Sequence, residues 1–444
     1  MSSDLRLAWL LLRGSNRREW IRMALTALGA LLATGFALAA AALLSMRGFV
    51  VHYGTGIIGD PGTRPNVALA LLALFIPITG FLGQCARIGA AHRDRRLASL
   101  RLAGAPPRQV RRIAALETGL ACLAGSVAGL IAFAALRAGF DPGREAQHPL
   151  VWIAFAGFTF AIPVLGVLVS LFALRRVAAS PLTEARRTRT VEGRNPMVTV
   201  LPIAAVGAVF AGIFTAVNPH SLGVPFMALA VVVATFAGAV AVTGGCARLL
   251  GRRLAASADA AVLMAAARLR TDPWAAARTH AAVLLVTTVC TAFAGIGLRL
   301  HEVVTAPGAY TDTSYYTSGI RLIGAGFLIA LAVALSGLAV GTVEALTSRR
   351  RNLAAQHAFG VPRRVLRRAV LLETALPLLP AVLLAGVGGM VIQLGWEAMT
   401  GGTTAPQLLP LLVPVAVYAA CLLAAATSLP LLRRTVHPAE LRYA

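Results

Sequence analysis

Residues 93–118 read RDRRLASLRLAGAPPRQVRRIAALET, and residues 349–374 read RRRNLAAQHAFGVPRRVLRRAVLLET. The two stretches align without a gap at an offset of 256 residues. Gly-x-Pro, Arg-Arg and Leu-Glu-Thr match in a single register, which chance similarity between two Arg-rich segments does not easily produce. The chain therefore contains an internal repeat.

The first copy predicts a helix, a tight turn and a second helix. The second apolar span of each repeat is expected to continue as this first helix. In the first copy the helix runs through Arg95 to Leu102 and ends at Gly104, because glycine often caps the end of a helix. Pro106 and Pro107 suit the first turn of the next helix, where a missing N–H group does no harm. The pattern is typical of a helical hairpin.

The second copy repeats this turn with Gly360 and Pro362. We therefore expect two hairpins, over residues 87–112 and 347–369. An arm of about 16 residues would reach about 24 Å at the rise of an α-helix.

Apolar stretches long enough to cross a bilayer flank both hairpins. The chain has 444 residues, of which 58% are hydrophobic and 13% charged, whereas about 25% of residues are charged in soluble domains. This composition excludes a soluble enzyme, a disordered protein and a secreted disulfide scaffold. The chain is predicted to be an all-α polytopic membrane protein. Its ten expected spans are residues 23–46, 66–86, 113–136, 151–174, 197–217, 224–247, 279–298, 320–346, 370–395 and 409–432.

The arginine residues predict the orientation of these spans. The 41 basic residues are all Arg and outnumber the 17 acidic residues, which gives a net charge of +24. With the N-terminus inside, 35 Arg fall on the inner side and 6 on the outer side, as the positive-inside rule requires. Both termini and both hairpins are therefore expected in the cytoplasm, below the plasma (inner) membrane. Dispersed Arg without interleaved aromatic residues suits anionic membrane lipids rather than nucleic acid.

The spans group around the repeat. We expect a first four-helix repeat over residues 1–196, a two-helix central insert over 197–247 and a second four-helix repeat over 248–444. Since each repeat has an even number of spans, the two repeats share one orientation and are parallel rather than inverted.

Glu117 and Glu373 occupy equivalent positions, about one turn inside the third span of each repeat. A carboxylate at this depth needs a partner, and the residues four positions earlier, Ile113 and Ala369, cannot provide one. An Arg five or six positions earlier, or one on the hairpin arm, is expected to form a structural ion pair. A proton-relay or substrate-binding carboxylate is the alternative.

Other features are modest. Residues 3–20 and 257–277 are typical of interfacial amphipathic helices, and Ser257 or Asp259 suits the N-cap of the second. His280 is expected at the cytoplasmic interface.

Nothing in the sequence predicts a cofactor or a metal ion on this chain. Without Lys there is no Gly-Lys-Ser/Thr phosphate-binding loop, and no His-Glu-x-x-His or paired Cys/His spacing occurs.

The repeated hairpin resembles the FtsX-like ABC permease family, of the MacB and BceB kind, in its ten-helix branch. The resemblance lies in Leu97, Arg101, Gly104 and Ala105, in the following Arg-Gln-Val, and in a Glu that begins the next span. It implies a partner, a cytoplasmic ABC ATPase dimer that binds ATP and contacts a coupling helix in each hairpin. The residues implied in this coupling are Arg101, Gly104, Pro106, Pro107, Arg108, His357, Gly360, Pro362, Arg363 and Arg364.

The chain departs from this family at three places. Arg96 and Asn352 occupy a position where the family usually has Glu, and His357 stands where the first copy has Arg101. Many members carry a large extracytoplasmic domain, whereas the corresponding outer loops here each have about 20 residues.

Three functions remain open from the sequence. The chain is expected to be the non-enzymatic permease subunit of an ABC transporter that exports or extracts a hydrophobic or amphiphilic substrate. A drug- or peptide-sensing scaffold that acts with an ATPase without bulk transport is the alternative. A secondary transporter is less favoured, because no Asp, Glu or Lys lies centrally in an expected span.

Overall fold

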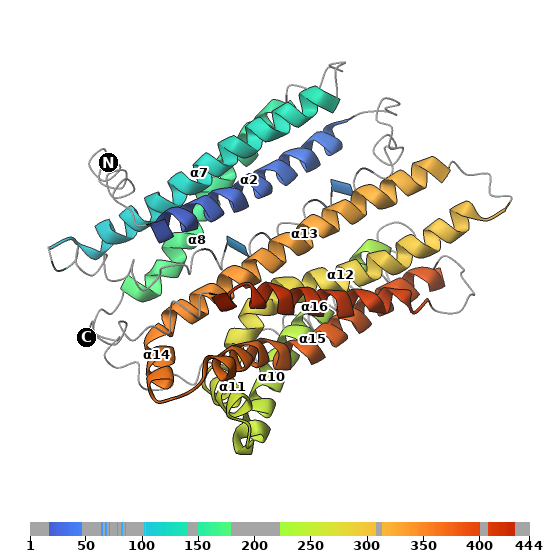
Figure 1. The fold of residues 1–444 in the computed structure, drawn as a ribbon. Coiled ribbons are helices and arrows are strands. Elements are labelled where there is room, and N and C mark those ends of the chain that lie inside the picture. The colour runs from blue at the N-terminus through green and yellow to red at the C-terminus, as the bar shows by residue number, and fades with distance from the viewer. Residues whose placement is uncertain are drawn as a thin grey trace. The chain divides into compact units, whose positions relative to one another are not determined.

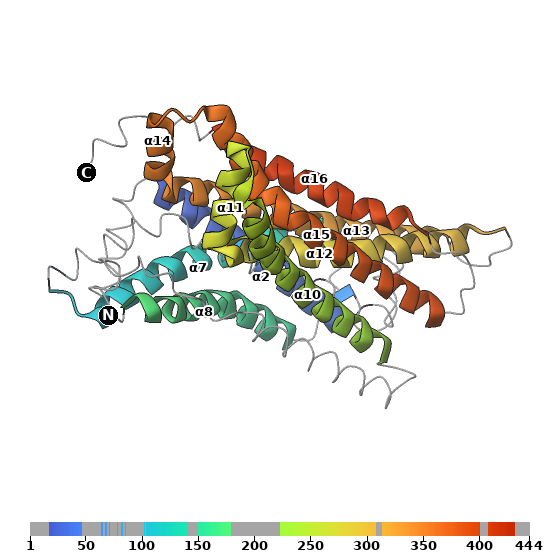
Figure 2. The same ribbon diagram turned by 90° about the horizontal axis from the view of Figure 1, so that it is seen from below.

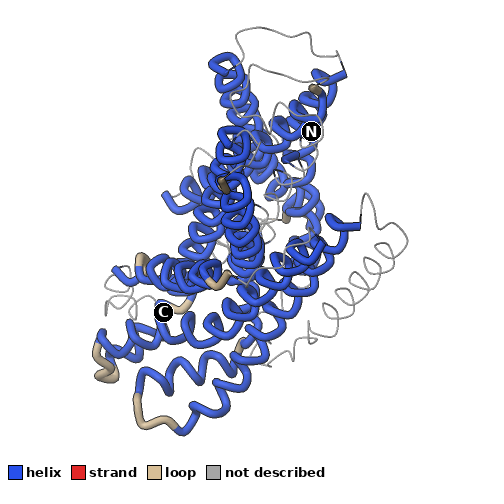
Figure 3. The backbone as a smooth tube through the Cα atoms, turned by 90° about the vertical axis from the view of Figure 1, so that its right-hand side faces the viewer, coloured by secondary structure: helices blue, strands red, loops and turns tan. Residues whose placement is uncertain are grey.

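The computed structural model describes residues 17–46, 102, 104–140, 150–178, 223–307, 313–399 and 407–430, with isolated positions between 64 and 85. All regular structure in these residues is helical (Figure 3). The long helices are α2 (Arg17–Ser45), α7 (Pro107–Phe140), α8 (Leu150–Ala178), α10 (Gly223–Arg253), α12 (Pro273–Thr305), α13 (Thr313–Ser348) and α15 (Arg363–Met399). The shorter ones are η1 (Leu254–Ala256), α11 (Ala260–Thr271), α14 (Arg350–Ala358), η2 (Leu409–Leu411) and α16 (Leu412–Ala426).

Seven stretches in the described part of the chain are long and apolar enough to cross a membrane. They lie in α2, α7, α10, α12, α13, α15 and the η2–α16 segment. The expected span 151–174 is also helical, as part of α8, but its described apolar stretch, Phe155–Leu168, is shorter. The expected span 197–217 lies outside the described residues, as does 66–86 apart from isolated positions. The prediction of an all-helical, multi-pass membrane protein is confirmed for the residues described.

The helices divide into two compact units. Unit 1 comprises residues 1–189 and 312–326, and unit 2 comprises residues 190–311 and 327–444. In unit 1, α2 packs along α7, and both contact α8 (Figure 1). Gly125 of α7 faces the Ala27 carbonyl of α2 so closely that a Cβ atom would overlap it. Small residues of this kind let helix backbones approach where lipid offers little hydrophobic driving force.

In unit 2, α15 is the helix around which the others pack. It contacts α10, α11, α12 and α16 (Figure 2). Three glycines of α15 each face a different neighbour: Gly386 faces Pro414 of α16, Gly388 faces Thr235 of α10, and Gly389 faces the Thr288 carbonyl of α12. The helix that bears Glu373 is therefore in close contact with three other helices.

The structure corrects the expected shape of the second hairpin. The preceding span is expected to continue as the helix of the first arm, but α13 ends at Ser348 and α14 turns away from it (Figure 2). Arg349 lies at this break with φ −104° and ψ 9°. The turn brings Leu353 of α14 back against Leu346 and Leu366, and burial of this apolar cluster accounts for the break.

Two smaller expectations concern α11 and His280. The interfacial helix within 257–277 is α11, and its N-cap is Asp259, whose side chain accepts a hydrogen bond from the Ala261 N–H at 2.8 Å. His280 lies near the start of the apolar stretch Thr279–Thr305 of α12, and its position at the membrane interface stays a prediction. His280 is only 2% exposed. The helix 3–20 falls outside the described residues, except that α2 begins at Arg17.

Gly125→Ala is expected to destabilise unit 1, because the added methyl group would push α7 away from α2. Overpacking of this kind costs about 1–3 kcal/mol and should lower the midpoint of thermal unfolding in detergent. Gly35→Ala on α2 is the matched control, since a methyl group there meets nothing within 4 Å. Equal midpoints for the two variants would contradict the close packing of α2 and α7.

Candidate functional site

The tip of the second hairpin is a tight, fully hydrogen-bonded turn. Gly360 has φ +93°, a left-handed conformation that glycine adopts without strain. Its N–H donates to the His357 carbonyl at 3.0 Å, and the Val361 N–H donates to the Gln356 carbonyl at 3.1 Å. These two bonds form a Schellman motif, which satisfies the last carbonyls of α14.

Pro362 lies immediately before the next helix, α15. Its carbonyl accepts from the Val365 N–H at 3.0 Å, and α15 begins at the following residue, Arg363. The His357 ring also contacts the Val361 carbonyl, with Nδ1 3.0 Å from the oxygen. The turn is thus held by both backbone and side-chain contacts.

The described residues of the first hairpin share the left-handed glycine and the helix start of this turn. Gly104 has φ +97°, and Gly104 and Gly360 are the glycines with positive φ in the described part of the chain. The Pro106 carbonyl accepts from the Gln109 N–H at 3.0 Å, and α7 begins at Pro107. The turn predicted from Gly-x-Pro is therefore present in both copies. Arg101 and the arm before it, apart from Leu102, lie outside the described residues.

Both tips expose a large apolar side chain that the sequence analysis did not single out. Phe359 is 90% exposed and Leu102 is 91% exposed. Each lies one or two residues before the glycine with positive φ. An apolar residue at this position of the Gly-x-Pro turn is the sequence signal that indicates an exposed side chain at the tip. Arg108, Arg363 and Arg364 are exposed on the helix that follows. Each tip therefore combines an apolar residue with adjacent positive charge.

An apolar cluster supports the second hairpin. Leu346 of α13, Leu353 of α14 and Leu366 of α15 are buried together, and Met264 of α11 packs against them. The cluster joins four helices, so α14 is packed against the rest of unit 2.

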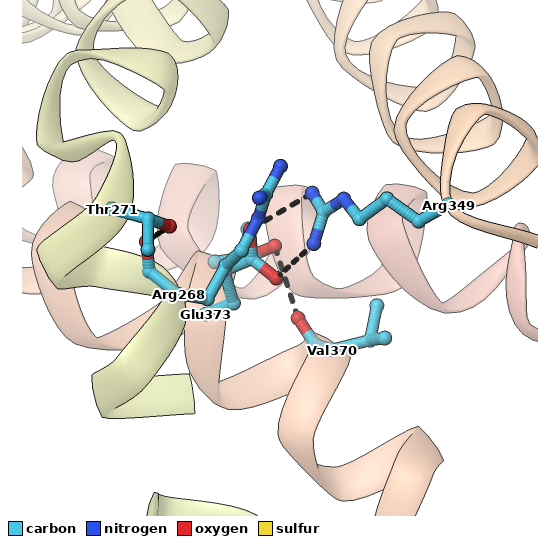
Figure 4. A network of polar contacts seen from close by, with 6 residues as sticks. Arg268, Thr271, Arg349, Val370 and Glu373 are labelled. Carbon is cyan, nitrogen blue, oxygen red and sulfur yellow. Dashed lines mark hydrogen bonds and ion pairs between the residues drawn. The ribbon is translucent and has the colours of Figure 1, made fainter. Parts of the chain in front are cut away.

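Glu373 lies at the base of this hairpin between two guanidinium groups (Figure 4). Arg349 donates to both carboxylate oxygens, at 2.9 and 3.0 Å. Arg268 of α11 places Nε 3.6 Å from Oε1. Such two-bond pairing of arginine with a carboxylate is strong and directional. Through these contacts Glu373 of α15 joins the start of α14 to the last turn of α11.

The electrostatic surroundings of Arg268 include Arg349 and two carboxylates, Glu373 and Asp272. Burial lowers the pKa of the Arg268 guanidinium, repulsion from Arg349 lowers it further, and attraction to Glu373 opposes the shift. A second ion pair, between Arg368 and Asp259 at 2.9 Å, joins α15 to the N-cap of α11. Because that pair is largely exposed, it contributes little to stability.

In unit 1, Glu117 pairs with Arg22 of α2, with 3.7 Å between Nη2 and Oε2. The side chains are only 3% and 7% exposed, so loss of either partner would leave a buried charge. The ion pairs predicted for Glu117 and Glu373 both exist. The predicted source of the partner is right for Glu373, since Arg349 begins the hairpin arm, and Glu117 is also joined to Arg22 of a neighbouring helix.

No structural feature among the described residues suggests a metal centre. There, no three His, Cys, Asp or Glu side chains gather as a metal ion would require.

Comparison with models of protein families shows which family the chain belongs to. The model of the FtsX-like permease C-terminal domain matches twice, at residues 67–182 and 324–436, which together cover just over half of the chain. The chain belongs to the FtsX-like permease family. The two matches begin 257 residues apart, close to the offset of the repeated hairpin. No curated protein and no solved structure matches the chain.

FtsX-like permeases are membrane components of ABC-type transport systems and are generally not enzymes. They generally act with cytoplasmic ABC ATPases. Each of the two matched regions of this permease contains one hairpin turn, Gly104 in the first and Gly360 in the second.

Glu373→Gln is expected to lower the stability of unit 2 by about 1–3 kcal/mol, because two half-buried guanidinium groups lose their shared negative charge. Arg349→Gln should cost a similar amount. The double variant should cost little more than either single variant, because both remove the same ion pair. Unfolding of the purified chain in detergent measures the three values.

Arg364→Gln is the control, since Arg364 is exposed at the hairpin tip and its loss should leave stability unchanged. Costs that simply add in the double variant would contradict direct pairing of Arg349 with Glu373.

Proposed function

We propose that this FtsX-like permease is the membrane subunit of an ABC transporter in the plasma membrane, driven by a separate cytoplasmic ATPase dimer. In this proposal both hairpins face the cytoplasm, and each contacts one ATPase subunit. The chain binds no ATP itself and performs no catalysis. The observation that carries the proposal is the exposed apolar side chain at each hairpin turn, Leu102 in the first and Phe359 in the second. Exposed Arg side chains lie beside both turns.

The chemistry of the tips favours a protein partner. Phe359, which is 90% exposed on the second tip, offers apolar surface that a partner could bury. Aromatic side chains and Arg are the residues that dominate binding energy in protein interfaces. A partner surface with an apolar pocket for Phe359 and acidic groups for Arg363 and Arg364 would match the second tip.

The contacts at the base of the second hairpin favour transmission of force. A displacement of α14 reaches α15 through the Leu346–Leu353–Leu366 cluster and through Arg349 and Glu373. Because α15 is packed closely against α10, α12 and α16, it cannot move without them. Closure of the ATPase dimer would in this way rearrange the spans of unit 2.

The substrate class follows from the short outer loops. Between the expected spans, the outer segments 47–65 and 299–319 have about 20 residues each, which is too few for a separate domain that would grip a large target. We therefore propose that the load is a small hydrophobic or amphiphilic molecule that enters from the membrane and is exported or extracted. Transport into vesicles tests this step, and a purely sensory scaffold would show stimulated ATPase activity without transport.

Replacing both turn glycines, Gly104→Pro with Gly360→Pro, is expected to abolish assembly with the ATPase and its stimulated ATP hydrolysis. Proline requires φ near −65° and cannot adopt the observed +97° and +93°. The measurement is ATP hydrolysis by the partner ATPase, reconstituted with the chain in liposomes.

Gly104→Asn with Gly360→Asn is the matched control, because asparagine tolerates a left-handed conformation. It should keep most of the stimulated activity. If the proline variant assembles and stimulates hydrolysis normally, the hairpins are not the coupling elements.

Phe359→Ser with Leu102→Ser is expected to leave the fold intact and to weaken binding of the ATPase by about tenfold or more, as loss of buried apolar anchors does. Both side chains are almost fully exposed in the chain alone, so thermal unfolding should not change. Phe359→Leu, which keeps an apolar group, should bind nearly as well as the natural chain. Unchanged affinity for the serine variant would show that the tips are not anchors.

A further inference from the structure

The last turn of α10 and the last turn of α11 meet in a basic elbow, formed by Arg252, Arg253 and Arg270. Gly251 lies against Arg270: a Cβ atom at Gly251 would be 2.8 Å from Arg270 Cγ and 3.0 Å from its backbone nitrogen. This close crossing brings Arg270 next to Arg252 and Arg253, which follow Gly251 directly. All three Arg are exposed.

The basic elbow has excess positive charge that nearby acids do not neutralise. Residues 248–272 contain five Arg and two acidic residues, Asp259 and Asp272. Asp259 is engaged by Arg368, and Asp272 interacts with Arg268. Within the described ranges, none of the three elbow Arg forms an ion pair.

Arg248 adds a fourth positive charge one turn before Arg252. Its guanidinium lies over the Trp274 ring, 5.6 Å from the ring centre. Like charges four residues apart on a helix repel, so Arg248 and Arg252 favour an anion that lies between or beside them.

The same face of α10 becomes apolar away from the elbow. Leu249, one turn before Arg252 and Arg253, is 48% exposed. Gly245, one turn further, is also exposed, and a Cβ atom there would meet nothing within 4 Å. Along this face of α10, Gly245 comes first, Leu249 follows one turn later, and the guanidinium groups of the elbow come last.

This order matches the depth of the groups in a bilayer. The apolar stretch Val231–Ala256 has 26 residues and is about 39 Å long at helical rise, whereas the hydrocarbon core is about 30 Å thick. The Arg at its end therefore reach the headgroup layer, while Leu249 and Gly245 lie nearer the acyl chains.

We propose that the basic elbow binds an anionic phospholipid. The lipid phosphate contacts Arg252, Arg253 and Arg270, and one acyl chain lies along Leu249 over Gly245. This inference does not depend on the ATPase partner.

The test is lipid retention by the purified full chain, measured by native mass spectrometry with phosphatidylglycerol and phosphatidylcholine as probes. The chain should retain phosphatidylglycerol preferentially. Arg252→Gln with Arg253→Gln should weaken that retention by about 25-fold, since each of the two basic residues near an anionic headgroup contributes about a fivefold gain in affinity. The matched control, Arg363→Gln with Arg364→Gln, removes the same charge from the hairpin tip and should have little effect.

A second variant tests the acyl chain and leaves every charge in place. Gly245→Leu should fold, because its side chain extends into open space, and it should weaken retention by filling the place of the acyl chain. Soluble glycerol phosphate should not displace the lipid. Equal losses in the two double Arg variants would overturn the proposal, as would full retention by the elbow variant or by Gly245→Leu, or displacement by glycerol phosphate.

Discussion

Backbone N–H and C=O groups inside a bilayer must be hydrogen-bonded within the protein, and the rest of this fold depends on that constraint. Helices meet it segment by segment, and then they must pack without water to drive them together. The chain solves this with glycine at the points of closest approach. In unit 1, Gly125 lets α7 pack closely against α2. In unit 2, Gly388 and Gly389 let α15 pack closely against α10 and α12. α15 is the axis of unit 2 for this reason.

The second constraint is that a carboxylate near the membrane needs a partner. Glu373 meets it with Arg349 and Arg268, and Glu117 meets it with Arg22. In unit 2 this pairing has structural consequences beyond the charges themselves. Arg349 lies where α13 breaks and α14 begins, so the ion pair and the apolar cluster of the hairpin act at the same bend.

α11 connects the two functional proposals. Its last turn carries Arg268, which pairs with Glu373, and two residues later Arg270, which lies in the basic elbow. A lipid held at the elbow and a partner held at the hairpin tip would therefore act on neighbouring parts of unit 2. The membrane surface would then be a fixed point against which the hairpin moves.

Much of this architecture is determined by local sequence. Seven of the expected apolar spans, the Gly-x-Pro turns and the need of Glu373 for a partner could be predicted, because each depends on a few adjacent residues. The break at Arg349, the pairing of Glu117 with Arg22 and the contact of Arg268 with Glu373 could not. They depend on residues brought together from different helices, and helix periodicity does not specify which faces meet. The sequence by itself determined a multi-span helical permease with two hairpins. Only the tertiary structure decided which cations neutralise the buried carboxylates and which side chains remain exposed at the tips, since both depend on packing between distant segments.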